Sequence, residues 1–172
     1  MKRLVLFVTL AVLLLSAPSF AGVIEESFFR VGGGVMATTA DLEEGDFAGI
    51  GSGAFLFPIY KNIYGETVYA KMKVEGPDWS NYGGKLIFFA KTPKTKEPNC
   101  YAFGTGTFTH DPDGEDEFTT AGYDFGLGVI FPVFGGKWFI EAAKKTTPEN
   151  NGREKSVWAL TAGVMIGLDP GQ

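Results

Sequence analysis

The segment Ala121–Phe131 alternates between large apolar residues and very small ones, and this pattern constrains the fold more than any other feature of the chain. Its odd positions are Ala121, Tyr123, Phe125, Leu127, Val129 and Phe131, and its even positions are Gly122, Asp124, Gly126, Gly128 and Ile130. Successive side chains of a β-strand point to opposite faces, so one face of this segment is apolar and aromatic while the other is mostly Gly with one acid. The pattern predicts a β-strand rather than a helix.

The same period of two recurs along the chain and predicts an eight-stranded, all-β domain. The predicted strands are Phe29–Ala37, Phe47–Phe57, Ile63–Val74, Tyr82–Lys91, Cys100–Thr109, Ala121–Phe131, Lys137–Lys145 and Val157–Leu168. The 16 Phe, six Tyr and three Trp support this class because aromatic residues suit pleated surfaces, whereas the 24 Gly would be costly inside helices. Glu66 and Ile87 fall on the wrong face of the third and fourth strands, which predicts a bulge or a register error there.

The first 21 residues have the layout of a secretory signal peptide. Lys2 and Arg3 precede the apolar run Leu4–Leu15, and Ser16–Ala21 offers small residues for cleavage after Ala21. The apolar run is shorter than the roughly 20 residues that a membrane-spanning helix needs. We therefore predict a signal peptide at residues 1–21 and one barrel domain at residues 22–172.

The connectors between the predicted strands alternate in kind. Long polar connectors are expected at Thr38–Asp46, Glu75–Asn81, His110–Thr120 and Thr146–Ser156, and the others at Pro58–Asn62, Pro132–Gly136 and the longer, Lys-rich Thr92–Asn99. Successive strands of a meander reverse direction, so the long connectors share one end of the sheet. The first three of them carry Asp41, Glu43, Glu44, Asp46, Glu75, Asp78, Asp111, Asp113, Glu115, Asp116 and Glu117. One end of the domain is therefore expected to be acidic.

Eight meandering strands can close into a barrel, and the faces of the strands decide which kind. The non-aromatic faces are rich in Gly and poor in Lys, Glu and Thr, so they suit a crowded lumen rather than a solvated outer wall. Arg30, Asp124 and Glu141 are then expected to meet inside as paired charges. These features favour a transmembrane β-barrel. The alternative is a secreted, lipocalin-like carrier of a hydrophobic ligand, in which Phe125, Leu127 and Val129 would face the lumen.

The chain resembles the small bacterial outer-membrane β-barrels of the OmpA-like and opacity-type group. The closing strand Thr161–Leu168 is similar to the C-terminal assembly signal of this family, although Asp169–Gln172 follow where family members usually end on an aromatic residue. The resemblance implies insertion by the outer-membrane assembly machinery, outer-membrane lipids and lipopolysaccharide as surroundings, and large loops outside the cell. Acidic loops of this kind would suit cationic, divalent-ion or host-surface partners.

The sequence offers little for catalysis. His110 is the single histidine, and Ser27, Ser52, Ser80 and Ser156 are the serines that follow the signal peptide. Some barrels of this size modify lipid A with a His and a Ser on the barrel wall, so an enzyme of lipid A or phospholipids is a second alternative. No motif around His110 supports the nucleophile–base pair that such an enzyme needs, and we expect a loop histidine instead.

No metal or cofactor site is predicted. Asp111–Glu117 resembles a calcium loop with Gly114 at its turn, but Thr120 stands where the bidentate Glu is required. One Cys, Cys100, and one His leave almost nothing for disulfides or Cys/His metal sites, and the formal charge of −5 argues against a nucleic-acid partner. We expect a non-enzymatic outer-membrane barrel with a structural or surface-interaction role.

Overall fold

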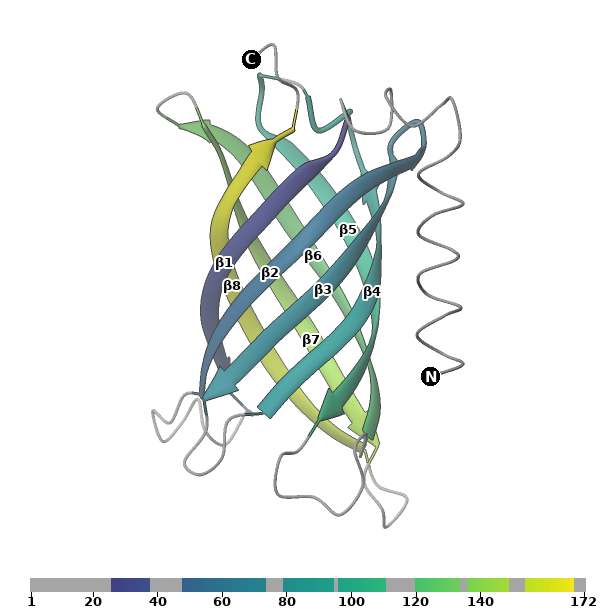
Figure 1. Ribbon diagram of the computed structural model, residues 1–172, viewed down its shortest axis with the longest axis vertical. Helices are drawn as coiled ribbons and strands as arrows, with labels where there is room; N and C mark the ends of the chain where they lie inside the picture. Colours follow the sequence, from purple (N-terminus) through teal and green to yellow (C-terminus); the bar gives the residue numbers. More distant parts are fainter. Residues whose placement is uncertain are drawn as a thin grey trace, which may run out of the picture.

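A computed structural model describes residues 26–37, 48–73, 79–94, 96–110, 120–133, 136–148 and 154–168. These residues form eight strands in a closed barrel (Figure 1). In chain order the strands are β1 (Phe28–Ala37), β2 (Ala48–Tyr60), β3 (Ile63–Lys73), β4 (Trp79–Phe89), β5 (Asn99–His110), β6 (Thr120–Val133), β7 (Gly136–Pro148) and β8 (Glu154–Gly167). Every predicted strand overlaps one of these, so the all-β, eight-stranded class is confirmed.

Each strand pairs in antiparallel fashion with its sequence neighbours, and β1 pairs with β8 to close the barrel. The seam runs from Phe28 opposite Gly167 to Ala37 opposite Trp158, and beyond it the amide of Leu168 donates to the carbonyl of Ser27 at 3.1 Å. This closure leaves no unpaired edge on the described strands. Within the same residues, no helix has the length and apolar character to cross a membrane.

The aromatic and aliphatic faces of the strands point outward. Phe125 and Leu127 on β6 are 65% and 68% exposed, whereas Asp124, which directly precedes Phe125, is 5% exposed. The same holds on β1, where Val31 is exposed and Arg30 is buried. The predicted face assignment is therefore confirmed. The carrier alternative is wrong, because it required these apolar residues to face the lumen.

The bulge or register error predicted for the third and fourth strands does not occur. Pairing between β3 and β4 is continuous from Ile63 opposite Phe88 to Met72 opposite Trp79, and both Glu66 and Ile87 lie in the lumen. The lumen accepts both types because its centre is polar and one of its ends is apolar, so the inward face does not follow a single composition. The register shift lies instead at the end of β2, between Pro58 and Tyr60.

The two ends of the barrel differ, as predicted. At the "turn end", at the top of Figure 1, β2 and β3 are joined by Lys61 and Asn62 alone, and Lys61 has a φ of 47°. This connector is shorter than predicted because β2 continues through Pro58 to Tyr60 at a bulge, where a missing N–H is tolerated. The "loop end" is the opposite end, where residues 38–47, 74–78, 111–119 and 149–153 connect the strands. The predicted signal peptide, the acidic loop residues and Asp169–Gln172 lie outside the described residues.

An apolar plug fills the lumen at the turn end. Its members are buried side chains from seven of the strands, namely Phe28, Leu56, Tyr64, Ile87, Phe89, Tyr101, Ile130 and Met165. The β4–β5 connector covers them, since Pro93 is fully buried and its carbonyl accepts a hydrogen bond from the Nζ of Lys137. Asn99 holds this connector by accepting from the amide of Lys91 at 2.9 Å. The turn end is thus packed like a protein core.

Candidate functional site

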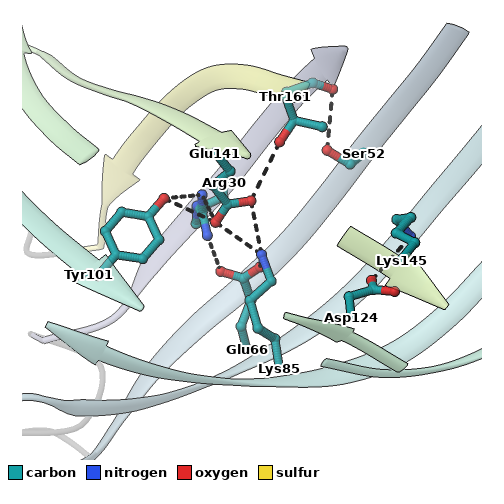
Figure 2. A network of polar contacts seen from close by, with 10 residues as sticks. Arg30, Ser52, Glu66, Lys85, Tyr101, Asp124, Glu141, Lys145 and Thr161 are labelled. Atoms are coloured by element: carbon teal, nitrogen blue, oxygen red, sulfur yellow. Dashed lines mark hydrogen bonds and ion pairs between the residues drawn. The ribbon is translucent and has the colours of Figure 1, made fainter. Parts of the chain in front are cut away.

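A cluster of charged side chains crosses the middle of the lumen, next to the plug (Figure 2). We call it the central network; its members are Arg30 on β1, Glu66 on β3, Lys85 on β4, Tyr101 on β5, Glu141 on β7 and Thr161 on β8. Six strands therefore contribute side chains to one point on the barrel axis. Such convergence follows from the inward alternation of each strand and from closure into a narrow barrel.

Arg30 is the hub of the central network. Its Nη1 donates to Glu66 Oε2 at 2.5 Å, and its Nη2 donates to Glu141 Oε1 at 2.8 Å and to the hydroxyl of Tyr101 at 3.1 Å. The planar guanidinium makes these contacts through two separate nitrogens, which fixes their directions. All these groups are buried, so their charges interact in a poorly solvated environment.

Lys85 completes the charge balance. Its Nζ lies 3.0 Å from both carboxylate oxygens of Glu141 and 3.2 Å from Glu66 Oε1. Tyr101 and Thr161 donate to the same Glu141 carboxylate at 3.0 and 3.5 Å. Two cations thus face two carboxylates, and the central network carries no net formal charge.

Aromatic rings support both cations. The Arg30 guanidinium carbon lies 3.8 Å from the centroid of Phe139, and the Lys85 ammonium lies 4.3 Å from the centroid of Phe103. The faces of aromatic rings attract cations, and this attraction is stronger where water is excluded. Phe139 itself lies against the backbone of Gly32, where an added methyl group would come within 2.8 Å of the ring.

A second ion pair lies nearer the loop end. Asp124 Oδ2 is 3.2 Å from the Nζ of Lys145, and the Lys145 side chain is 19% exposed. The prediction that Arg30 and Glu141 pair inside the barrel is confirmed. The prediction that Asp124 meets them is wrong, because Asp124 sits opposite Lys145 in the β6–β7 register.

Sequence reasoning did not assign Glu66, Lys85 or Tyr101 to the site. A signal for two of them was present, because Glu66 broke the expected alternation of its strand and Lys85 pairs with it across β3 and β4. Opposite charges at a cross-strand pair stabilise each other. Tyr101 carried no such signal, since a Tyr near a strand end equally suits the outer wall.

The central network is a set of mutually paired charges reinforced by hydroxyl groups. Each carboxylate is held by two cations, and Glu141 also accepts hydrogen bonds from the hydroxyls of Tyr101 and Thr161. The described part of the chain does not bring three or more His, Cys, Asp or Glu residues together as metal ligands. Cys100 is exposed and has no disulfide partner.

The residues singled out for other chemistry are only partly described. The backbone of His110 pairs with that of Ser80 across β4 and β5, while the position of its side chain lies outside the description. Ser27 is buried at the turn end and Ser52 lines the lumen, so neither serine lies at the same place as His110. The acidic segment Asp111–Glu117 also lies outside the described residues.

Known structures share this architecture. The N-terminal β-barrel domain of Pseudomonas aeruginosa OprF superposes with a TM-score of 0.57 at 13% sequence identity, covering 83% of this chain and 97% of that domain. Ail, the attachment invasion locus protein of Yersinia pestis, crystallised with the heparin analogue sucrose octasulfate, gives a TM-score of 0.40 at 12% identity, covering 81% and 96%. No protein-family model matches the sequence, and no curated protein is similar to it in sequence. The chain has the fold of small outer-membrane β-barrels, as its sequence predicted.

Proposed function

We propose that this chain is an exported, non-enzymatic barrel of the bacterial outer membrane, with residues 1–21 removed and residues 22–172 forming the mature protein. Its role would be structural or surface-interacting, through the acidic connectors at the loop end. The observation that supports this most is the apolar outer wall around a polar lumen whose described charges are paired.

The outer wall is incompatible with water as its main surroundings. Eighteen large apolar or aromatic side chains are exposed, among them Phe88, Phe125, Leu127, Leu160 and Ile166. Removing one such side chain from water is worth about 1.5–3 kcal/mol, and soluble monomers rarely expose a contiguous apolar patch of this kind. Aromatic residues near both ends of the strands, including Trp138 and Trp158, suit the two membrane interfaces.

The acidic residues of the connectors at the loop end would then form the surface that binds a partner. The orientation implied by the family resemblance puts these connectors outside the cell, where lipopolysaccharide surrounds the barrel. A dense set of acids raises the local concentration of cations and favours basic partners. During biogenesis the outer-membrane assembly machinery would be the transient partner.

Cell fractionation followed by gel electrophoresis with and without boiling tests this proposal. We expect the protein in the outer-membrane fraction, with a mobility that changes on boiling because the closed barrel resists detergent until heated. Recovery as a soluble periplasmic or secreted protein would contradict the proposal.

One observation favours a second function, an enzyme that modifies lipid A or phospholipids. Ser80 is the cross-strand partner of His110, so the single histidine has a serine at the nearest position of the neighbouring strand. His110→Ala and Ser80→Ala should then each abolish a change in the lipid profile that expression produces, while Ser156→Ala on β8 should not. Identical lipid profiles with and without the protein would exclude this function.

A further inference from the structure

The outer wall of the barrel carries a groove of about 870 Å³ that crosses β2 to β6. We propose that this outer groove binds an acyl chain of one anionic phospholipid, whose phosphate headgroup is held by the basic turn end through Lys61. The inference rests on the proposed function, because it requires that the outer wall faces a bilayer.

Apolar side chains form the two walls of the outer groove. On one side Phe57 and Ile59 of β2 lie over Gly65 of β3, where an added methyl group would come within 2.6 Å of the Phe57 ring. On the other side the ring of Phe125 from β6 lies 3.3 Å from the position of such a group on Gly104. The space between the walls therefore suits a hydrocarbon chain.

The floor of the outer groove is low because glycines face outward there. Gly84 of β4 pairs with Gly106 of β5, and a Cβ at either position would meet no atom within 4 Å. An acyl chain can thus approach the strand backbone at the floor while it contacts aromatic rings at the walls. The volume also falls within the range of about 300–1,000 Å³ that is usual for small-molecule sites.

The outer groove lies in the half of the wall that is nearer the turn end. The row of outward-facing residues that borders it toward the loop end is Tyr69, Tyr82 and Phe108. The rings of Tyr69 and Tyr82 are 5.2 Å apart, so this row limits the groove on that side. In the other direction the groove reaches Ile59, two residues before Lys61 of the β2–β3 turn.

The turn end is rich in positive charge outside the plug. The lysines described there are Lys61, Lys91, Lys94, Lys96 and Lys137, and the carboxylates described beside them are those of Glu26 and Glu97. Lys91 pairs with Glu97, which leaves an excess of cations. Basic residues close to a membrane surface attract anionic headgroups, so the charge of this end favours an anionic over a zwitterionic lipid.

Lys61 is the lysine best placed for the headgroup. None of the ion pairs of the described residues includes it, and its Nζ lies 5.1 Å from the ring centroid of Tyr60. Its φ of 47° lies in the left-handed region, which Gly or Asn adopts more easily than Lys. The amide of Phe89 donates to the carbonyl of Asn62 at 2.9 Å, so this turn is held against the neighbouring strand. A lysine charge is therefore fixed at the mouth of the outer groove.

Native mass spectrometry of the folded barrel, released from detergent, tests the proposal. Phosphatidylglycerol and phosphatidylethanolamine with identical acyl chains are titrated separately, and the fraction of barrels that carry one lipid gives an apparent affinity. Lys61→Asn removes the charge with a residue that suits the turn, and Gly84→Leu fills the floor. The matched controls are Lys71→Asn, on the loop-end side of Tyr69, and Gly53→Leu, at an outward-facing glycine beyond the groove.

We expect phosphatidylglycerol to bind more tightly than phosphatidylethanolamine, and Lys61→Asn to weaken phosphatidylglycerol alone, by about fivefold. Gly84→Leu should weaken both lipids by about tenfold, because its side chain takes the place of a few methylene groups of the acyl chain. The two control variants should bind like the wild type. Gel mobility without boiling confirms the fold of each variant, and Gly106→Leu replaces Gly84→Leu if the latter does not fold.

Equal affinity for the two lipids, or equal effects of Lys61→Asn and Lys71→Asn, would overturn the assignment of the headgroup. Equal effects of Gly84→Leu and Gly53→Leu would overturn the groove as the place of the acyl chain, and so would dimers that carry no lipid. Each of these results would leave the outer-membrane location standing, because fractionation measures that separately.

Discussion

At the scale of single residues, Arg30 carries most of the organisation of the lumen. It contacts Glu66, Glu141 and Tyr101 from three other strands and lies on the ring of Phe139. Buried ion pairs add little net stability when compared with apolar replacements of both partners, but removal of one partner leaves the other charge uncompensated. The central network is therefore expected to fix the register of the closed barrel, and its loss should be costly.

Arg30→Met should lower the free energy of unfolding by about 3–5 kcal/mol, because Lys85 alone cannot neutralise both Glu66 and Glu141. Urea unfolding in lipid vesicles, followed by the gel mobility of the folded form, measures this change. Arg30→Lys keeps the charge but replaces the two nitrogens that bind Glu66, Glu141 and Tyr101 with a single one, so we expect an intermediate loss.

Lys91→Met is the matched control, because it removes a lysine from the exposed Lys91–Glu97 pair. That ammonium lowers the pKa of the Glu97 carboxyl, yet both side chains are well solvated, so we expect no measurable change in stability. An Arg30→Met protein as stable as this control would show that the central network does not stabilise the barrel.

At the scale of strands, glycines allow the lumen to hold large side chains without widening the barrel. Gly32 of β1 faces inward opposite Gly163 of β8, and the ring of Phe139 from β7 packs into the space between them. Gly53 of β2, which lies opposite Val31 of β1, faces outward and has open space where a Cβ would lie. Glycine is therefore required for packing at inward-facing Gly32, whereas outward-facing Gly53 has room for a larger residue.

Gly32→Ala should therefore destabilise the barrel by about 1–3 kcal/mol, since the methyl group would come within 2.8 Å of Phe139 and of the Ala162 carbonyl. Gly53→Ala should leave stability unchanged or raise it by up to about 1 kcal/mol through the unfolded chain. Vesicle unfolding curves of the two variants provide the comparison, and equal effects would contradict the packing role of Gly32.

The strands were predictable because most of them follow one simple rule, apolar on the outer wall and small or polar in the lumen. Ala121–Phe131 follows that rule except at Ile130, which is buried in the plug, and the structure extends the strand only to Thr120–Val133. The inward faces of β3 and β4 were harder to predict, because Glu66 and Ile87 both face a lumen that changes from polar to apolar along its axis. The partners of Arg30 needed the register between strands, which no single strand contains.

At the scale of the whole molecule, the two ends of the barrel differ in charge as well as in shape. The plug and the β4–β5 connector close the turn end, whereas the sequence gathers its acids at the loop end. The charges described within the lumen are balanced in pairs, so we expect the acids of the connectors to dominate the field outside the barrel.

Neutralising the acids of one connector should accordingly weaken binding to a cationic partner. The variant Asp111→Asn, Asp113→Asn, Glu115→Gln, Asp116→Asn, Glu117→Gln removes five negative charges without touching a described strand. We expect at least tenfold weaker binding of polylysine to barrels in vesicles at low salt, and a smaller difference at high salt. Unchanged binding at low salt would indicate that these acids do not form the interaction surface.

The outer wall provides a test of membrane embedding that is independent of the loops. Trp138 on β7 lies toward the turn end and Trp158 on β8 toward the loop end, and both are exposed on the outer face at 43% and 51%. In a Trp79→Phe background, proteins that retain only one of these two tryptophans should both lose fluorescence in vesicles of lipids with brominated acyl chains, because each ring contacts lipid near one interface. Bromine close to the headgroup should quench more than bromine at the chain end, since aromatic girdles lie at the two interfaces rather than at the bilayer centre. Insensitivity of both tryptophans to brominated lipid, together with strong quenching by aqueous iodide, would mean that the apolar wall does not face a bilayer.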